Sequence, residues 1–131
     1  MIYIRTLIEG EPETLPFIRV FEFRDNIDEN IFFESVKTIR RKLSNSLKIN
    51  TNECLIIFCA YVIDEIRIKN AISVIEKNAS KILQKNQVMI GVPETLRKIT
   101  FEGLIDDLQI KRIIIKNALP KSNYILAEQG A

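Results

Sequence analysis

An unbroken apolar run from Cys54 to Ile63 constrains the fold of this chain more than any other feature. The run is about half as long as the roughly twenty residues that cross a bilayer as a helix, so it predicts a core element and not a membrane span. Because nearly every position is apolar, periodicity alone allows either a buried helix or a buried strand. Asn50 and Glu53 precede the run at the spacing of a capping box, which favours a helix.

Two further helices are expected around this element. The first is expected from about Asp28 to about Asn45, because its apolar residues recur every three to five positions and basic residues gather in its C-terminal half. Its apolar positions are Ile31, Phe32, Val36, Ile39 and Leu43. Another helix is expected within residues 71–83, with its end marked by Asn78 or Asn86, and Gly91 with Pro93 is expected to break any helix at that point.

Alternating segments near both ends of the chain predict strands. Ile2–Ile8 and Phe17–Phe23 are separated by a loop that contains Gly, Pro and Glu. Further on, Lys98–Ile105 and Gln109–Ile115 flank a turn at Asp106-Asp107-Leu108 and predict an antiparallel hairpin. The predicted fold class is therefore α+β, with three to four helices packed together with a C-terminal antiparallel β-hairpin, plus extra N-terminal strands.

The chain has 131 residues, enough for one domain with a real core. We expect residues 1–25 to form a strand-loop-strand extension, residues 26–120 to form the main domain, and residues 121–131 to be a flexible tail. The aromatic set Phe17, Phe21, Phe23, Phe32 and Phe33 is interpreted as part of the core.

Charge and composition narrow the partners and the chemistry. The net charge of +2 does not indicate nucleic acid or an anionic membrane as a partner. The basic run Arg40-Arg41-Lys42 is interpreted as a solvated helix end. Without histidine, the chain lacks the commonest general acid/base and transition-metal ligand. Cys54 and Cys59 are interpreted as buried thiols rather than a metal or redox pair. No charged-then-apolar leader or cysteine framework is present, which predicts a cytoplasmic protein.

Two motifs of this chain resemble the urease gamma subunit family. Gln87-Val88-Met89-Ile90-Gly91-Val92-Pro93-Glu94 resembles the family motif of Gln-Val-Met, one variable residue, then Gly-Val-Pro-Glu. Leu47-Lys48-Ile49-Asn50, followed after two residues by Glu53, resembles the family's Leu-Lys-Leu-Asn and helix-opening Glu. The spacing between the two motifs needs no gap, and the similarity extends over about residues 28–120.

The resemblance implies a non-catalytic structural subunit that packs against urease alpha and beta chains in an oligomeric, nickel-dependent urea amidohydrolase. The nickel belongs to the alpha chain, so no catalytic, cofactor-binding or metal-binding residue is implied here. The residues implied to be structural or to contact other subunits are Leu47, Lys48, Asn50, Glu53, Gln87, Val88, Met89, Gly91, Val92, Pro93 and Glu94.

Alternatives to this interpretation are open. Gln87–Glu94 is either a subunit-contact loop or a plain helix-to-strand connection. Family glycines after the first and second helices fall on Ser46, Glu65 and Lys69, and residues 1–25 have no family counterpart. These differences motivate a second hypothesis, a stand-alone interaction module that binds itself and has no urease activity. An enzyme in its own right is a third hypothesis, although no constellation of lysine, carboxylate or thiolate groups stands out.

Overall fold

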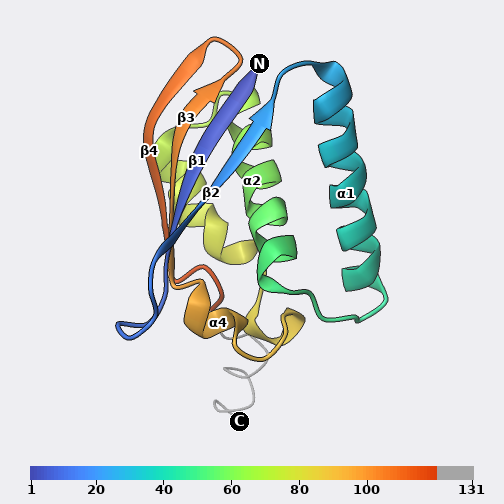
Figure 1. Ribbon diagram of the computed structural model, residues 1–131, viewed down its shortest axis with the longest axis vertical. Coiled ribbons are helices and arrows are strands. Elements are labelled where there is room, and N and C mark those ends of the chain that lie inside the picture. Colours follow the sequence, from blue (N-terminus) through green and yellow to red (C-terminus); the bar gives the residue numbers. More distant parts are fainter. Residues whose placement is uncertain (121–131) are drawn as a thin grey trace.

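The computed structural model describes residues 1–120, so the predicted tail at 121–131 lies outside the described residues. The elements in chain order are β1 (Ile2–Glu9), β2 (Phe17–Phe23), α1 (Asn26–Ser44), α2 (Thr51–Arg67), α3 (Ile72–Asn78), η1 (Ala79–Lys81), η2 (Lys85–Gln87), α4 (Val92–Thr95), β3 (Lys98–Ile105) and β4 (Leu108–Lys116). The strands form one antiparallel sheet in the order β2-β1-β3-β4. In Figure 1, α2 lies between this sheet and α1. The α+β fold class is confirmed.

The two predicted strand pairs form a single sheet because β1 lies between β2 and β3. Its residues pair from Ile2 opposite Ile105 to Glu9 opposite Lys98 on the β3 side. Strand periodicity places alternate β1 side chains on the face toward the helices, where Ile2, Ile4 and Ile8 are buried. The strands of the predicted N-terminal extension therefore share a core with the hairpin that follows α4.

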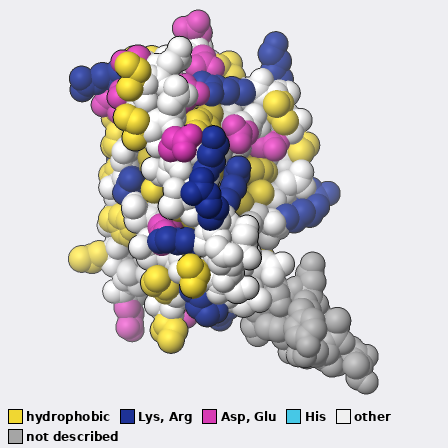
Figure 2. All heavy atoms as spheres, turned by 90° about the vertical axis from the view of Figure 1, so that its right-hand side faces the viewer, with side chains coloured by type: hydrophobic (Ala, Val, Ile, Leu, Met, Phe, Trp, Pro, Cys, Tyr) yellow, Lys and Arg dark blue, Asp and Glu magenta, His cyan; other side chains and the backbone are white. Residues whose placement is uncertain are grey.

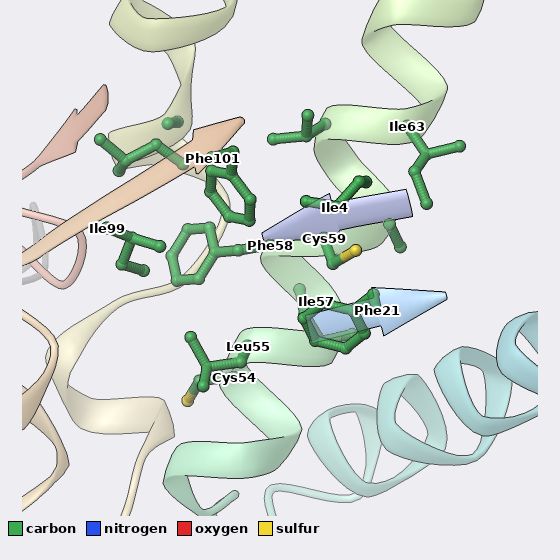
Figure 3. Close-up of a cluster of buried hydrophobic side chains, with 14 of the residues drawn as sticks. Ile4, Phe21, Cys54, Leu55, Ile57, Phe58, Cys59, Ile63, Ile99 and Phe101 are labelled. Carbon is green, nitrogen blue, oxygen red and sulfur yellow. The ribbon is translucent and has the colours of Figure 1, made fainter. Parts of the chain in front are cut away.

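Helix α2 forms the centre of that core. The apolar run is helical, as its capping box predicts: Asn50 Oδ1 accepts from the Glu53 amide at 2.8 Å, and the Asn50 amide donates to Glu53 Oε1 at 3.1 Å. The run is buried on most sides, because α1 packs against one face of α2 and side chains of β3 lie against another. Figure 3 shows the Phe58 ring lying between Ile99 and Phe101 of β3.

The outer helix α1 begins after Asp25, whose side chain accepts from the Asp28 amide at 2.9 Å. Its buried residues are Phe32, Val36 and Ile39, at helical spacing. The expectation that Ile31 belongs to this face is wrong, because the side chain is 64% exposed. Phe17 is also exposed, because it begins the edge strand β2.

The segment after α2 confirms one prediction and corrects another. The helix expected within residues 71–83 ends as α3 at Asn78, which is one of its two expected ends, and the chain continues as the 3-10 turn η1. Gly91 and Pro93 do not only end structure, because α4 begins between them. Gly91 adopts φ +91° before the helix, and Pro93 occupies the first turn, where no amide hydrogen is needed.

Left-handed residues end both long helices in Schellman motifs. After α1, Ser46 has φ +59°, its amide donates to Leu43 O, and the Leu47 amide donates to Lys42 O. After α2, Lys69 has φ +63° and the same pair of hydrogen bonds recurs, from Lys69 to Ile66 O and from Asn70 to Glu65 O. Ser46 and Lys69 therefore adopt a backbone conformation that glycine adopts at lower cost.

Ser46→Gly and Lys69→Gly are each expected to raise the free energy of unfolding by about 0.5–1 kcal/mol, because glycine adopts this conformation without the steric cost of a Cβ. Urea denaturation followed by circular dichroism measures the change. Ser44→Gly is the control, since Ser44 is the last helical residue of α1 and glycine there lowers stability. A loss of stability in both variants, equal to that of the control, would contradict the expectation.

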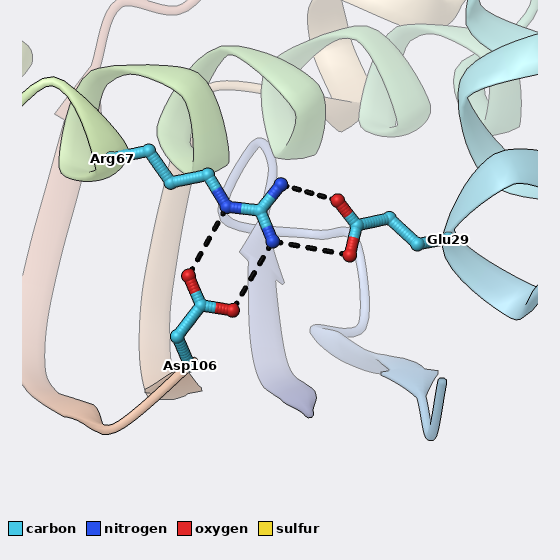
Figure 4. Close-up of polar contacts among 3 residues, drawn as sticks. All are labelled: Glu29, Arg67 and Asp106. Carbon is cyan, nitrogen blue, oxygen red and sulfur yellow. Dashed lines mark hydrogen bonds and ion pairs between the residues drawn. The ribbon is translucent and has the colours of Figure 1, made fainter. Parts of the chain in front are cut away.

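Arg67 joins three elements at the end of α2 (Figure 4). Its guanidinium contacts both carboxylate oxygens of Glu29 in α1 and donates to Asp106 Oδ1 and Oδ2 at 3.2 Å in the β3–β4 turn. Hydrogen bonds from Glu29 and Asp106 raise the pKa of Arg67 further above its usual value. The planar guanidinium suits this double recognition, which an ammonium does not reproduce.

Candidate functional site

The fold brings together the two motifs that the sequence analysis singled out. Ile49 and Val88 form a parallel bridge, in which the Ile49 amide donates to Gln87 O at 3.1 Å and the Met89 amide donates to Ile49 O at 2.9 Å. Lys48 Nζ adds a hydrogen bond to Asn86 O at 2.6 Å. Segments about forty residues apart in the sequence are therefore fixed to each other through their backbones.

This bridge separates buried from exposed apolar side chains. Ile49, Val88 and Val92 are buried and anchor the segment in the core. Leu47 is 56% exposed, Met89 is 45% exposed, and the side chain of Ile90 is fully exposed. We call Leu47, Met89 and Ile90 the apolar tip. Figure 2 shows exposed hydrophobic side chains at this lower end of the molecule, below basic side chains in the middle of the face.

A tight turn holds the tip in its position. The Val92 amide donates to Met89 O at 3.2 Å, Gly91 has φ +91°, and Thr95 Oγ1 donates to Gly91 O at 3.0 Å. No atom lies within 4 Å of the position that a Cβ on Gly91 would take, so the glycine is needed for its conformation and not for space. The turn therefore exposes Ile90 on a backbone that hydrogen bonds restrain.

The opening of α2 is charged and partly buried beside this site. Lys42 Nζ lies 2.6 Å from Glu53 Oε2. Burial raises the pKa of Glu53, but the hydrogen bonds from Lys42 and from the Asn50 amide, with the Lys42 charge, together lower it below its usual value. Glu53 is thus ionised at neutral pH and serves the helix cap. It is a structural carboxylate, because both of its oxygens already have partners.

The loop between β1 and β2 also contacts the Gln87–Glu94 motif. The Glu11 amide donates to Glu94 O at 2.9 Å, and Arg97 Nη2 lies 3.1 Å from Glu11 Oε1. A Cβ on Gly10 would lie 2.5 Å from Glu94 O, so only glycine permits this approach. The N-terminal segment therefore supports the turn from which Ile90 projects.

The two cysteine thiols of the described residues are not set up for catalysis. Burial raises the pKa of Cys54 to about 12, with a further increase from the Glu53 charge, and burial also raises the pKa of Cys59. Both thiols are therefore neutral and poor nucleophiles. Within residues 1–120, no three His, Cys, Asp or Glu side chains gather closely enough to hold a metal ion. None of the helices in that range is long and apolar enough to cross a membrane.

The predicted site residues differ in how exposed they are to solvent. Val88, Val92 and Glu53 are buried, whereas Leu47, Lys48, Asn50, Met89, Gly91 and Glu94 are exposed, and Gln87 and Pro93 are intermediate. Ile90 is not among the predicted site residues, because it occupies the variable position of the motif. An isoleucine placed before a glycine in a turn is the signal that could have found it. Ile49, Gly10 and Glu11 were also missed, because their roles depend on long-range contacts.

Comparisons with known proteins find the same family that the two motifs resemble. The family described as "Urease, gamma subunit" matches residues 24–118. Urease subunit gamma from Halalkalibacterium halodurans is 30% identical over 80 residues, which cover 60% of this chain and 80% of that protein. Urease subunit gamma from Prochlorococcus marinus strain AS9601 is 28% identical over 80 residues, covering 61% and 80%. The family match spans most of the chain and includes both motifs, and this chain therefore belongs to the urease gamma subunit family.

Proposed function

We propose that this chain is a non-catalytic structural subunit of a urease assembly and that it docks onto urease alpha and beta chains through the apolar tip. The observation that supports this most directly is the exposure of Leu47, Met89 and Ile90 on a hydrogen-bonded backbone. Exposed apolar side chains on backbone segments that hydrogen bonds hold in place are typical of a protein interaction site.

The division of labour follows from the chemistry of the chain. Its thiols are buried and neutral, and it contains no histidine. In this proposal the alpha chain holds the nickel, and the present chain contributes contact area and rigidity. The bridge between Ile49 and Val88 reduces the conformational entropy that the tip loses on binding, because the backbone is already ordered. The cytoplasmic location stays a prediction.

The test measures binding of the full chain to the purified alpha and beta chains of a urease from the same source, by isothermal titration calorimetry. Ile90→Asp is expected to weaken binding by about thirtyfold or more, because burying an isoleucine contributes about 2 kcal/mol and each 1.4 kcal/mol is a factor of ten. The midpoint of its thermal unfolding is expected to be unchanged, since the Ile90 side chain is fully exposed and does not pack in the core.

Ile68→Asp is the matched control. Ile68 is 66% exposed and lies at the C-terminal end of α2, opposite the end at which Asn50 and Glu53 form the capping box. The same substitution there is expected to leave binding unchanged. Equal binding by Ile90→Asp and the unaltered chain would contradict docking through the tip. If the chain ignores the urease chains and instead forms its own oligomers as concentration rises, the stand-alone interaction module is the better description.

A further inference from the structure

We propose that the edge of β3 is a strand-binding surface and that Ile2–Glu9 is its built-in occupant, which keeps strands of other chains from adding to the sheet there. This goes beyond the docking role of the apolar tip, because it concerns a different surface and residues outside the family match.

The extent of the family match shows why this edge needs an occupant. Residues 24–118, which match the family, contribute only β3 and β4 to the sheet. The edge of β3 would otherwise present a row of unpaired N–H and C=O groups, which readily pair with another chain. A two-stranded hairpin is also marginally stable by itself. In this protein β1 pairs with all of β3, from Lys98 to Ile105.

Side chains fix β1 on this edge along its length. Ile2, Ile4 and Ile8 are at most 1% exposed, and each buried side chain of this kind contributes favourably to holding the strand in place. Arg5 Nη1 lies 2.7 Å from Glu102 Oε1 on the outer face. At the chain start, the Asp106 amide donates to Met1 O at 2.9 Å. The surface therefore fits an extended segment with apolar side chains at alternate positions.

Gly103 shows that β3 is shaped for this neighbour. It lies in the family-matched part of the chain, has φ +148°, and pairs with Ile4. A Cβ on Gly103 would lie only 2.0 Å from Tyr3 O. A side chain at this position is therefore incompatible with the observed approach of β1, and a residue of β3 is adapted to a strand from the N-terminal extension.

The other edge of the hairpin is protected in a different way. The Ile114 amide of β4 donates to Glu76 Oε2 of α3 at 2.7 Å. A helix side chain thus satisfies a backbone donor that another chain could otherwise use. In the hairpin, a helix side chain satisfies one donor of β4 and β1 pairs with all of β3, while β2 is left as the edge strand on that side of the sheet.

The test compares two substitutions in β1 of the full chain. Ile4→Asp puts a charge at a buried position facing the helices and is expected to expel β1 from the sheet. Tyr3→Asp makes the same change on the outer face, where Tyr3 is 38% exposed, and is the matched control. Light scattering is expected to show at least a doubling of mass with concentration for Ile4→Asp, while the control keeps the mass of the unaltered chain.

A labelled synthetic peptide of residues 1–12 then identifies the surface. It is expected to bind the Ile4→Asp chain and to suppress its association, and the same peptide carrying Ile4→Asp is expected to bind at least about tenfold more weakly. Fluorescence anisotropy measures both affinities. The proposal is overturned if the Ile4→Asp chain keeps its helical circular dichroism but stays monomeric, or if both peptides bind equally.

If the Ile4→Asp chain loses its helical circular dichroism, the proposal is tested instead on the unaltered chain cleaved in the β1–β2 loop. A protease site placed at Glu13-Thr14, both exposed in the β1–β2 loop, lets β1 be separated from the rest after folding. The cut protein is expected to retain β1 through gel filtration and, after unfolding and refolding, to exchange it for the labelled peptide. Loss of β1 from a chain that remains a folded monomer, or exclusion of the peptide after refolding, would overturn the proposal. Neither readout depends on Ile90 or on urease chains.

Discussion

Gly103→Ala is expected to lower the free energy of unfolding by about 4 kcal/mol, one of the two largest losses that we predict for a single substitution in this chain. Two costs combine at this position. An alanine at φ +148° is strained by about 1–3 kcal/mol, and its Cβ would meet Tyr3 O at 2.0 Å, so that β1 and β3 must separate. Urea denaturation measures the loss, and hydrogen exchange of the β1 amides measures the separation.

Gly91→Ala separates these two costs. Gly91 also has a positive φ, but no atom lies within 4 Å of the position of its missing Cβ. Only the conformational cost applies, so we expect a loss of about 1–2 kcal/mol. Equal losses in the two variants would show that β1 does not approach β3 as closely as the structure indicates.

Phe58→Ala is expected to cost about 4 kcal/mol, because the ring is fully buried at the centre of α2 and its removal leaves a cavity. Figure 3 shows Ile99 and Phe101 on either side of the ring, and neither can fill the space without moving a strand. The midpoint of urea denaturation measures the change. Phe33→Ala is the control, since Phe33 is only partly buried at the margin of the core and is expected to cost less than half as much. Similar losses would contradict a central position for α2.

Local signals predicted most of the secondary structure. The capping box at Asn50 and Glu53 distinguished helix from strand in an apolar run that periodicity could not resolve, because it depends only on residues three apart. Alternation predicted all four strands for the same reason. The prediction was wrong where burial depends on a neighbour, as for Ile31, and at Gly91 and Pro93, which open a short helix instead of only ending one.

The candidate site was only partly visible in the sequence. Both motifs could be recognised in the sequence. The bridge between Ile49 and Val88 that joins them, and the full exposure of Ile90 in the turn, could not. A comparison of motifs gives no weight to the variable position, so it does not select Ile90. The structure is needed to show that Ile90 is exposed while Val88 and Val92, two residues away on either side, are buried.

The sequence by itself determined the elements of this protein, because helix caps, strand alternation and turn residues act over a few neighbouring positions. It also determined the family, through motifs that the fold keeps intact. Only the tertiary structure decided that β1 lies between β2 and β3 and that Gly103 must lack a side chain. It also decided that Gly10 lies close to the backbone of Glu94. The contacts of Gly103 with Tyr3 and of Gly10 with Glu94 join residues far apart in the sequence, and their energy comes from burial and steric fit between surfaces that exist only once the chain has folded.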